Sequence, residues 1–404
     1  MNKKTFNDWW SRNDLQHDAG TLLFANNSVA ELAKQFSTPA FFYNARRVTD
    51  NIRRLHNALD DADLENQYRI YYAMKANRFS PLLTHIKKSG LAGIDACSPE
   101  EVLHAISCGF RAEDISFTAT SLSPADLDQL TRINGLTTNC DSLHSIRRIG
   151  ELSPGRSIGI RVNPAMGVGR AQNDKLQYCG CSTTKFGIYK EQFNEAIKLA
   201  AQYDLTINRI HFHTGCGYLT PQLEIWDEII TECFWFVDQL DSIEYVNVGG
   251  GLGVPHVATD QPLDLKKWAG ILAKHFHGKD LQLEIEPGDY IVKDAGILLL
   301  NVNMVEQKKD TLFVGLNAGF NIALEPAVYN LPFQPVPVVV REGEKSSVTI
   351  IGNINEALDV WYTNIDMPPL HENDTLALIN AGAYSSSMAS NHCMRGEFRE
   401  FLLL

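Results

Sequence analysis

Short runs of β-branched and aromatic residues recur along the first three quarters of the chain, and segments with helical spacing separate them. Such runs favour strands. They cover residues 70–76, 93–98, 115–120, 136–142, 157–164, 207–215, 245–253 and 281–288. Two of the helical segments open with Ser-Pro, at Ser98 and Ser123, which suits an N-cap followed by a first helical residue. Eight strand and helix units over about 250 residues predict an α/β fold, a (β/α)8 TIM barrel.

The pattern changes after about residue 300, where strand-like runs follow one another without helices between them. These runs cover residues 311–320, 336–341, 346–354 and 375–384. We therefore predict a C-terminal all-β domain over 301–404 and a barrel over 41–300. Residues 1–40 form an N-terminal segment that we expect to pack with the β domain.

Composition narrows the class of protein. The chain has 404 residues, is 44% hydrophobic and 21% charged, and can form two globular domains. A formal net charge of -12 argues against a general nucleic-acid binder, which needs clustered Lys and Arg. No apolar run approaches the roughly 20 residues that span a bilayer, so we expect no membrane contact and a cytoplasmic location. The eight scattered cysteines predict core thiols rather than disulfides or a zinc site.

A barrel of this kind gathers its chemistry at the carboxyl ends of its strands. Residues of functional type lie at those ends in this sequence: Lys75, Asp95, Arg161, His213, Gly249–Gly251 and Glu286. We therefore treat them as candidates for one site.

Each candidate also has a plain structural interpretation. A lone lysine such as Lys75 more often reaches solvent or pairs with a carboxylate, but an amine in a partly dry pocket can form a Schiff base. Glycines at 249–251 mark many turns, or their N–H groups can hold a phosphate. Glu286 is either a surface carboxylate or the partner of a pyridinium nitrogen.

His213 leaves more than one possibility open. It shares a strand face with His211, because residues two apart point the same way. A single histidine here is most simply a hydrogen-bonded core residue. A metal pair, as in metal-dependent barrel hydrolases, needs further His and Asp residues on later strands, and the sequence offers no obvious set.

An amine, a phosphate cradle and a carboxylate for a ring nitrogen together describe a site for pyridoxal 5'-phosphate (PLP). The chain resembles the fold-type III PLP-dependent decarboxylases, the group that contains diaminopimelate and ornithine decarboxylases. The resemblance covers nearly the whole chain and rests on motifs in a fixed order: "YYAMKAN", "GIDACSPEEV", "RVNP", "TKFGIY", "HFHTGCG", "GGGLG", "EPG" and "INAGAYSSSMAS". It implies an alanine racemase-like barrel with a β domain.

The resemblance also implies roles for residues around the cofactor. Lys75 would carry PLP, His213 would stack on the ring, and Glu286 would hold the pyridine nitrogen. The phosphate would be bound by residues of two motifs, namely Gly250, Gly251 and Tyr384. Asp95 and Arg161 match positions near the cofactor, and Cys216 replaces a serine that contributes one phosphate contact.

A segment of the β domain completes the neighbouring active site in this family, so we expect a homodimer with shared sites. In this chain the segment reads "NEALD". Glu356 and Asp359 are kept, whereas Asn355 replaces a cysteine that takes part near the return of the proton. We therefore expect Lys75 or a water molecule to supply that proton.

Other departures concern the substrate. Asp289 and Glu325 stand where the family's diaminopimelate decarboxylases have arginines, while Tyr329 is retained. Such arginines grip a distal carboxylate, and acids would repel it. We therefore expect the substrate not to be meso-diaminopimelate but a basic amino acid or an amino-acid moiety on a larger conjugate. Alternatively, both acids pair with nearby cations and say nothing about the substrate.

Three classes of function remain open. A PLP-dependent amino-acid decarboxylase is favoured. A PLP-dependent racemase shares both domains, but "HFHTG" and "EPG" resemble the decarboxylases far more. A non-catalytic regulatory homologue is opposed by the retention of Lys75, His213 and Glu286.

Overall fold

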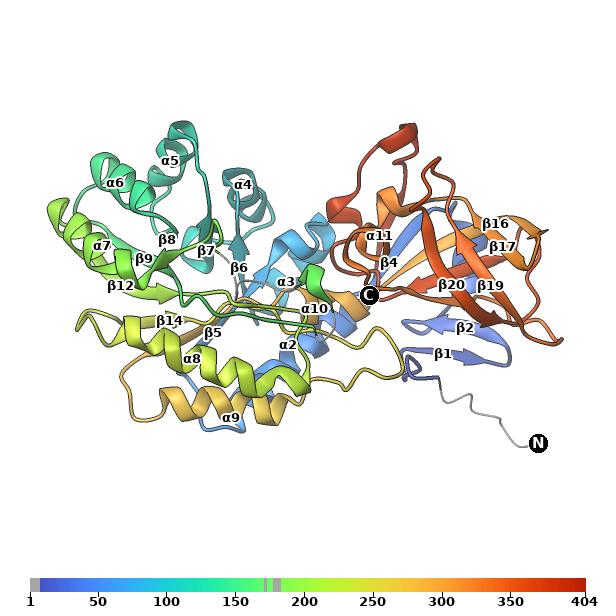
Figure 1. The fold of residues 1–404 in the computed structure, drawn as a ribbon, viewed down its shortest axis with the longest axis horizontal. Coiled ribbons are helices and arrows are strands. Elements are labelled where there is room, and N and C mark those ends of the chain that lie inside the picture. Colours follow the sequence, from blue (N-terminus) through green and yellow to red (C-terminus); the bar gives the residue numbers. More distant parts are fainter. Residues whose placement is uncertain (1–7, 171–172, 177–182) are drawn as a thin grey trace. The chain divides into compact units, whose positions relative to one another are not determined.

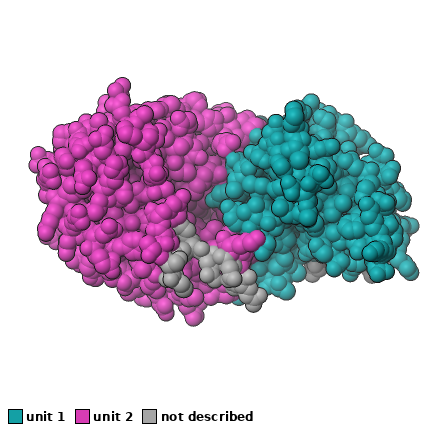
Figure 2. Space-filling model, turned by 45° about the horizontal axis from the view of Figure 1, so that its top comes forward, with its two compact units in different colours: residues 1–48, 254–261, 292–404 teal, residues 49–253, 262–291 magenta. Residues whose placement is uncertain are grey.

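The protein is described from a computed structural model, which covers residues 8–170, 173–176 and 183–404. The chain forms two compact units (Figure 2). One consists of residues 49–253 and 262–291, and the other of residues up to 48, 254–261 and 292–404. The predicted boundaries after 40 and 300 correspond to divisions after 48 and 291 in the structure, and 254–261 belongs to the second unit.

The first unit is a closed barrel of parallel strands (Figure 1). Each strand hydrogen-bonds to the next in chain order, and the last pairs with the first. The eight strands in the described part of the chain are β5 (Tyr68–Ala73), β6 (Gly93–Ala96), β7 (Ile115–Ala119), β8 (Thr137–Cys140), β9 (Ser157–Asn163), β12 (Thr206–His211), β14 (Tyr245–Asn247) and β15 (Gln282–Ile285). The predicted (β/α)8 barrel is confirmed.

Helices alternate with these strands: α3 (Ser80–Ser89), α4 (Pro99–Ser107), α5 (Pro124–Thr131), α6 (Leu143–Leu152), α7 (Lys190–Gln202), α8 (Leu223–Val237) and α9 (Leu265–Phe276), with α2 (Ala45–Asp60) before β5. The Ser-Pro openings act as expected. The hydroxyl of Ser98 accepts the N–H of Glu101, and that of Ser123 accepts the N–H of Asp126. Each serine thus satisfies a backbone donor that the first turn of a helix leaves free.

The second unit is built on a mostly antiparallel sheet whose longest strand is β16 (Gly296–Lys308). The main path runs β18 (Gln334–Pro337), β21 (Thr375–Ile379), β16, β17 (Thr311–Leu316), β19 (Ser346–Ile351) and β20 (Val360–Met367). Strand β4 (Ala40–Asn44) pairs with β16 and also with β22 (Arg399–Leu403), so segments from both ends of the chain enter one sheet.

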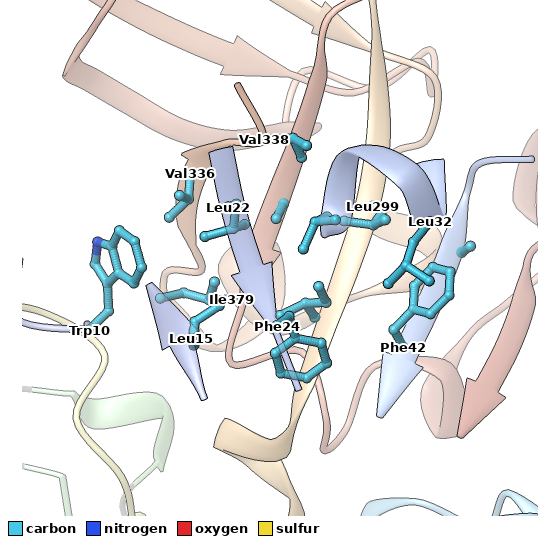
Figure 3. Close-up of a cluster of buried hydrophobic side chains, with 14 residues drawn as sticks. Trp10, Leu15, Leu22, Phe24, Leu32, Phe42, Leu299, Val336, Val338 and Ile379 are labelled. Atoms are coloured by element: carbon cyan, nitrogen blue, oxygen red, sulfur yellow. The ribbon is translucent and has the colours of Figure 1, made fainter. Parts of the chain in front are cut away.

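A small sheet of β1 (Leu15–Asp18), β2 (Thr21–Phe24) and β3 (Asn27–Ser28) precedes helix α1 (Val29–Gln35). Its apolar side chains join those of the main sheet in one buried cluster (Figure 3). Leu22 and Phe24 contribute from the N-terminal segment, and Leu299 and Ile379 from β16 and β21. Burial of apolar area from distant segments is the main source of stability in such a core.

Within the described ranges, none of the helices is long and apolar enough to cross a membrane. The cytoplasmic location stays a prediction.

Candidate active site

The carboxyl ends of the barrel strands carry the candidate residues. Lys75 lies in a single 3-10 turn, Met74–Ala76, directly after β5, and Asp95 lies within β6. Arg161 belongs to β9, His213 follows β12 by two residues, and Glu286 follows β15 by one. Because all these strands are parallel, their carboxyl ends meet at one rim of the barrel.

Lys75 and Asp95 form an ion pair on neighbouring strands. The Nζ atom of Lys75 donates to Oδ2 of Asp95 over 3.0 Å; the lysine side chain is 42% exposed, whereas that of Asp95 is 2% exposed. Burial and the negative charge of Glu286 raise the pKa of Asp95 to about 7, although Lys75 acts in the opposite direction. The amine is thus anchored by a carboxyl that titrates near neutrality.

Glu286 is buried and accepts three hydrogen bonds from three other strands. Ser116 and Asn247 donate to Oε1 over 3.0 and 2.7 Å, and His211 Nε2 lies 2.9 Å from Oε2. Burial alone would raise the pKa of Glu286, but the hydrogen bonds from His211 and Ser116 and the positive charge of Lys75 lower it. An ionised carboxylate offers about four acceptor positions, so one position on Oε2 is left for a further donor.

Three of these Glu286 contacts were not predicted from the sequence. The sequence gives no separate indication of Ser116 on β7 and Asn247 on β14, and it shows His211 only as a neighbour of His213 on the same strand face. Strand alternation does provide a signal, because Arg209 and His211 face Glu284 and Glu286 in the same two-residue steps. Recognising it requires knowledge of which strands are adjacent.

His213 is held as a neutral ring. Its Nδ1 atom accepts the backbone N–H of Gly250 over 3.2 Å, which places the ring proton on Nε2. Burial, together with the charges of Lys75 and Arg161, lowers the pKa of His213 well below its ordinary value. A neutral imidazole with a fixed orientation offers a flat aromatic face and suits the predicted stacking role.

The glycines after β14 are required by close packing. Gly249 and Gly251 adopt φ values of +70° and +93°, which L side chains rarely adopt. A Cβ atom on Gly250 would collide with the backbone oxygen of Glu286, and one on Gly251 with that of Gly215. The N–H of Gly250 is used by His213, so its role as a phosphate ligand stays a prediction.

Other predicted residues of the barrel unit occupy the same strand ends. The guanidinium of Arg161 lies 4.5 Å from the centre of the Phe186 ring. Cys216 lies in the two-residue strand β13 (Gly215–Cys216), which pairs in parallel with β10 (Val168–Gly169). Asp289 is partly exposed and opens the short helix α10 (Asp289–Val292).

The β unit holds the remaining predicted residues, and two of them have firm partners. Glu325 is buried and forms an ion pair with Lys293. The two carboxylate oxygens of Asp359 accept the backbone N–H groups of Phe320 and Ile354 over 2.7 and 2.6 Å. Both acids are thus held by partners within the β unit, and their roles toward the substrate stay predictions.

Four further predicted residues of this unit are at least partly exposed. Asn355 and Glu356 lie in an exposed loop, where His392 Nε2 lies 3.3 Å from Glu356 Oε1. Tyr329 ends helix α11 (Glu325–Tyr329), and Tyr384 has a φ of +52° in the turn after β21. Their roles toward substrate and cofactor stay predictions.

The barrel residues fit a pyridoxal cofactor. Lys75 provides an amine, His213 a neutral ring, and Glu286 an ionised oxygen with one acceptor position left among the described residues. A pyridinium N–H is the kind of donor that this position can accept. The described residues contain no cluster of three or more His, Cys, Asp or Glu side chains that could hold a metal ion.

Comparison with known families agrees with this geometry. The family model described as "Pyridoxal-dependent decarboxylase, pyridoxal binding domain" matches residues 46–293. This range includes the whole barrel unit, residues 49–253 and 262–291.

Relatives match over almost the full chain. A diaminopimelate decarboxylase of Methanothermobacter thermautotrophicus is 31% identical, with 96% of this chain and 91% of the relative covered. The structure of diaminopimelate decarboxylase from M. jannaschii aligns with a TM-score of 0.86 and 26% identity, covering 96% of this chain and 92% of that one. The structure of diaminopimelate decarboxylase from Helicobacter pylori complexed with L-lysine aligns with a TM-score of 0.82 and 26% identity. The alignment covers 93% of this chain and 94% of that one.

The expectation that the substrate is not meso-diaminopimelate is therefore wrong. It conflicts with relatives that cover most of the chain and are named for that substrate. The physical argument treated Asp289 and Glu325 as negative charges that repel the substrate, and for Glu325 the structure shows why this failed. The structure pairs Glu325 with the ammonium of Lys293, so the two together have no net charge.

The comparisons support a decarboxylase over the racemase and the non-catalytic homologue. The rim of the barrel contains the amine, the neutral ring and the ionised carboxylate that such an enzyme requires. The chain belongs to the pyridoxal-dependent decarboxylases and acts on an amino acid with pyridoxal 5'-phosphate as cofactor.

Proposed function

We propose that the chain removes one α-carboxylate from meso-diaminopimelate to give lysine. The bound cofactor supplies an electron-withdrawing ring that stabilises the charge left on the α-carbon when carbon dioxide departs. Glu286 supports this chemistry because an ionised, buried oxygen favours a proton on the ring nitrogen.

The observation that carries the choice of substrate is the ion pair of Glu325 with Lys293. A bare buried carboxylate at position 325 would oppose a dicarboxylic substrate, since like charges a few ångströms apart repel. With its charge compensated, Glu325 gives no reason to set this chain apart from the relatives named diaminopimelate decarboxylase.

The return of a proton to the α-carbon is assigned to Lys75. An asparagine amide is no proton donor at neutral pH, so Asn355 cannot replace the family's cysteine in that step. The Nζ atom of Lys75 is hydrogen-bonded to Asp95, whose pKa lies at about 7. A protonated amine that is hydrogen-bonded to a carboxyl group whose charge changes near neutrality suits general acid catalysis.

We further propose that the working form is a homodimer whose active sites are shared. The β unit supports this with exposed apolar side chains, Leu358 beside Glu356 in the loop and Met394 beside Cys393. The contact of His392 with Glu356 links these two segments. A second copy of the chain would remove such side chains from water.

The test is to incubate the PLP-loaded enzyme with meso-diaminopimelate and to measure carbon dioxide and lysine. The Lys75→Ala variant is the control for reaction without the enzyme amine. Release of both products in equal amounts by the wild type alone is the expected result. If ornithine, arginine or lysine is decarboxylated and diaminopimelate is not, the proposed substrate is refuted while the family assignment stands.

A further inference from the structure

His211 lies beneath the rim of the barrel, one strand step below His213. Its side chain is 2% exposed, and its Nε2 atom lies 2.9 Å from Oε2 of Glu286. The other oxygen of Glu286 is occupied by Ser116 and Asn247, so His211 is the described partner of the oxygen that retains an open acceptor position. The ring therefore fixes the direction in which that position points.

The second ring nitrogen of His211 shows which form the ring takes. Nδ1 is buried and has no hydrogen-bond partner in the described part of the chain. An imidazolium would bury an N–H without an acceptor as well as a positive charge, and both are costly. A neutral ring with its proton on Nε2 leaves only a bare lone pair at Nδ1 and donates to Glu286.

One strand step below His211 and Glu286, the charges of Arg209 and Glu284 cancel each other. Arg209 donates from Nε to Glu284 over 2.7 Å, and its guanidinium lies 4.4 Å from the centre of the Tyr245 ring. Arg209 and Glu284 pair with each other, so Glu286 depends on its own neighbours. A neutral donor such as His211 leaves the negative charge of Glu286 available to a cation above it.

We propose that His211 is a positioning residue: as a neutral Nε2–H donor it holds Oε2 of Glu286 so that the carboxylate accepts, and keeps protonated, the pyridine nitrogen of the cofactor. The inference rests on the cofactor of the family and is independent of the proposed substrate. It makes His211 a contributor to cofactor charge rather than a residue that merely fills the core.

The matched pair of variants is His211→Gln and His211→Leu. The glutamine amide lies as many bonds from Cβ as Nε2 of histidine and can donate without charge, whereas leucine fills space and donates nothing. Each full-length variant is loaded with PLP labelled with 15N in the ring, and the nitrogen shift is read by solid-state NMR. The control is His256→Leu, a buried histidine of the β unit whose Nδ1 contacts the Pro332 oxygen.

The expected result is a protonated ring nitrogen in the wild type, in His211→Gln and in His256→Leu, and loss of that proton in His211→Leu. The dissociation constant for PLP should rise on the order of 10- to 100-fold in His211→Leu only, as for loss of a hydrogen bond to a charged group. An unchanged nitrogen shift in His211→Leu would overturn the proposal. So would a His211→Gln variant that behaves like His211→Leu, because charge and not donation would then matter.

A measurement on the wild-type protein tests the same proposal and does not depend on whether a variant folds. The full chain without cofactor is labelled with 15N in its histidine rings, and the His211 signals are assigned by their coupling to Glu286. A protonated Nε2 with a bare Nδ1 is expected. Protons on both nitrogens, or a proton on Nδ1 alone, would contradict the proposal.

Discussion

Lys293 and Glu325 form an ion pair inside the β unit, with the lysine side chain 0% and the glutamate side chain 5% exposed. The ammonium also donates to the backbone oxygen of Ala383 over 3.2 Å. It lies 5.6 Å from the centre of the Tyr384 ring. One buried cation thus ties the start of helix α11 to the turn that carries Tyr384.

Glu325→Gln should destabilise the protein strongly, because it leaves Lys293 buried without its counter-charge. Loss of one partner of a buried pair costs about 3–5 kcal/mol. Glu356→Gln is the control, since Glu356 is exposed and its contact with His392 contributes about 1 kcal/mol or less. Urea unfolding followed by tryptophan fluorescence measures both variants.

The double variant Lys293→Met/Glu325→Gln separates charge from packing. It removes both ions, so it should recover part of the stability that Glu325→Gln loses. If the double variant is no more stable than Glu325→Gln, an unpaired charge at Lys293 is not the cause of the loss.

Lys75 should be the lysine that carries the cofactor. This assignment rests on the position of Lys75 at the end of β5, beside Asp95 and on the same barrel as Glu286. Reduction of the loaded enzyme with borohydride and peptide mapping should find the pyridoxyl group on Lys75. Lys87, which pairs with Asp114 on the same unit, is the internal comparison. Label on Lys87, or on any lysine other than Lys75, refutes the assignment.

The barrel could be predicted because its evidence is local. Each run of β-branched and aromatic residues matches one strand, and a polar residue at the end of such a run lies at the rim wherever the strands are parallel. Lys75, Asp95 and Glu286 were therefore identified without any contact being known.

The ion pairs could not be predicted because their evidence is not local. Glu325 and Lys293 are 32 residues apart, and His211 and Glu286 are 75 apart. The sequence shows the charge of Glu325 but not the cation that cancels it. For the same reason the sequence does not show that the carboxylate of Asp359 accepts backbone N–H groups of its own unit.

The stability of the cofactor-free protein should depend on pH through Asp95. Its pKa rises from 3.8 unfolded to about 7 in the fold, so its protonated form is favoured by folding. The contribution is fully present below about pH 4 and is lost as the pH rises toward 7. Asp95→Asn does not titrate, and its unfolding free energy should vary less with pH between 4 and 7. Equal slopes for the variant and the wild type would contradict this.

The contribution of Glu286 to stability should have the opposite pH dependence and should change in a lower pH range. The pKa of Glu286 is lowered from the ordinary 4.5 in the fold, so its ionised form is favoured by folding. That contribution is present above about pH 4.5 and is lost as the pH falls toward 2. Glu286→Gln should remove this loss, and denaturant midpoints between pH 2 and 5 measure it. A wild-type curve that the substitution leaves unchanged would show that Glu286 is not the group responsible.

Shared active sites predict recovery of activity when two inactive variants are mixed. Glu356→Ala is the better partner for Lys75→Ala than a change at Asp359, because Asp359 holds its own loop through Phe320 and Ile354 whereas Glu356 is exposed. If each site takes Lys75 from one chain and Glu356 from the other, a mixed dimer contains one intact site and one doubly altered site. Random exchange makes about half of the dimers mixed, so about a quarter of the wild-type rate should return. The rate of carbon dioxide release is measured after subunit exchange. Differently tagged chains verify the exchange, because mixed dimers co-purify on either tag.

The control is Lys75→Ala mixed with Asp95→Asn. Both residues lie on the barrel of one chain, so any mixed dimer has one altered residue in each site and stays inactive. Exchange without recovery in the first mixture would show that Glu356 serves no neighbouring site.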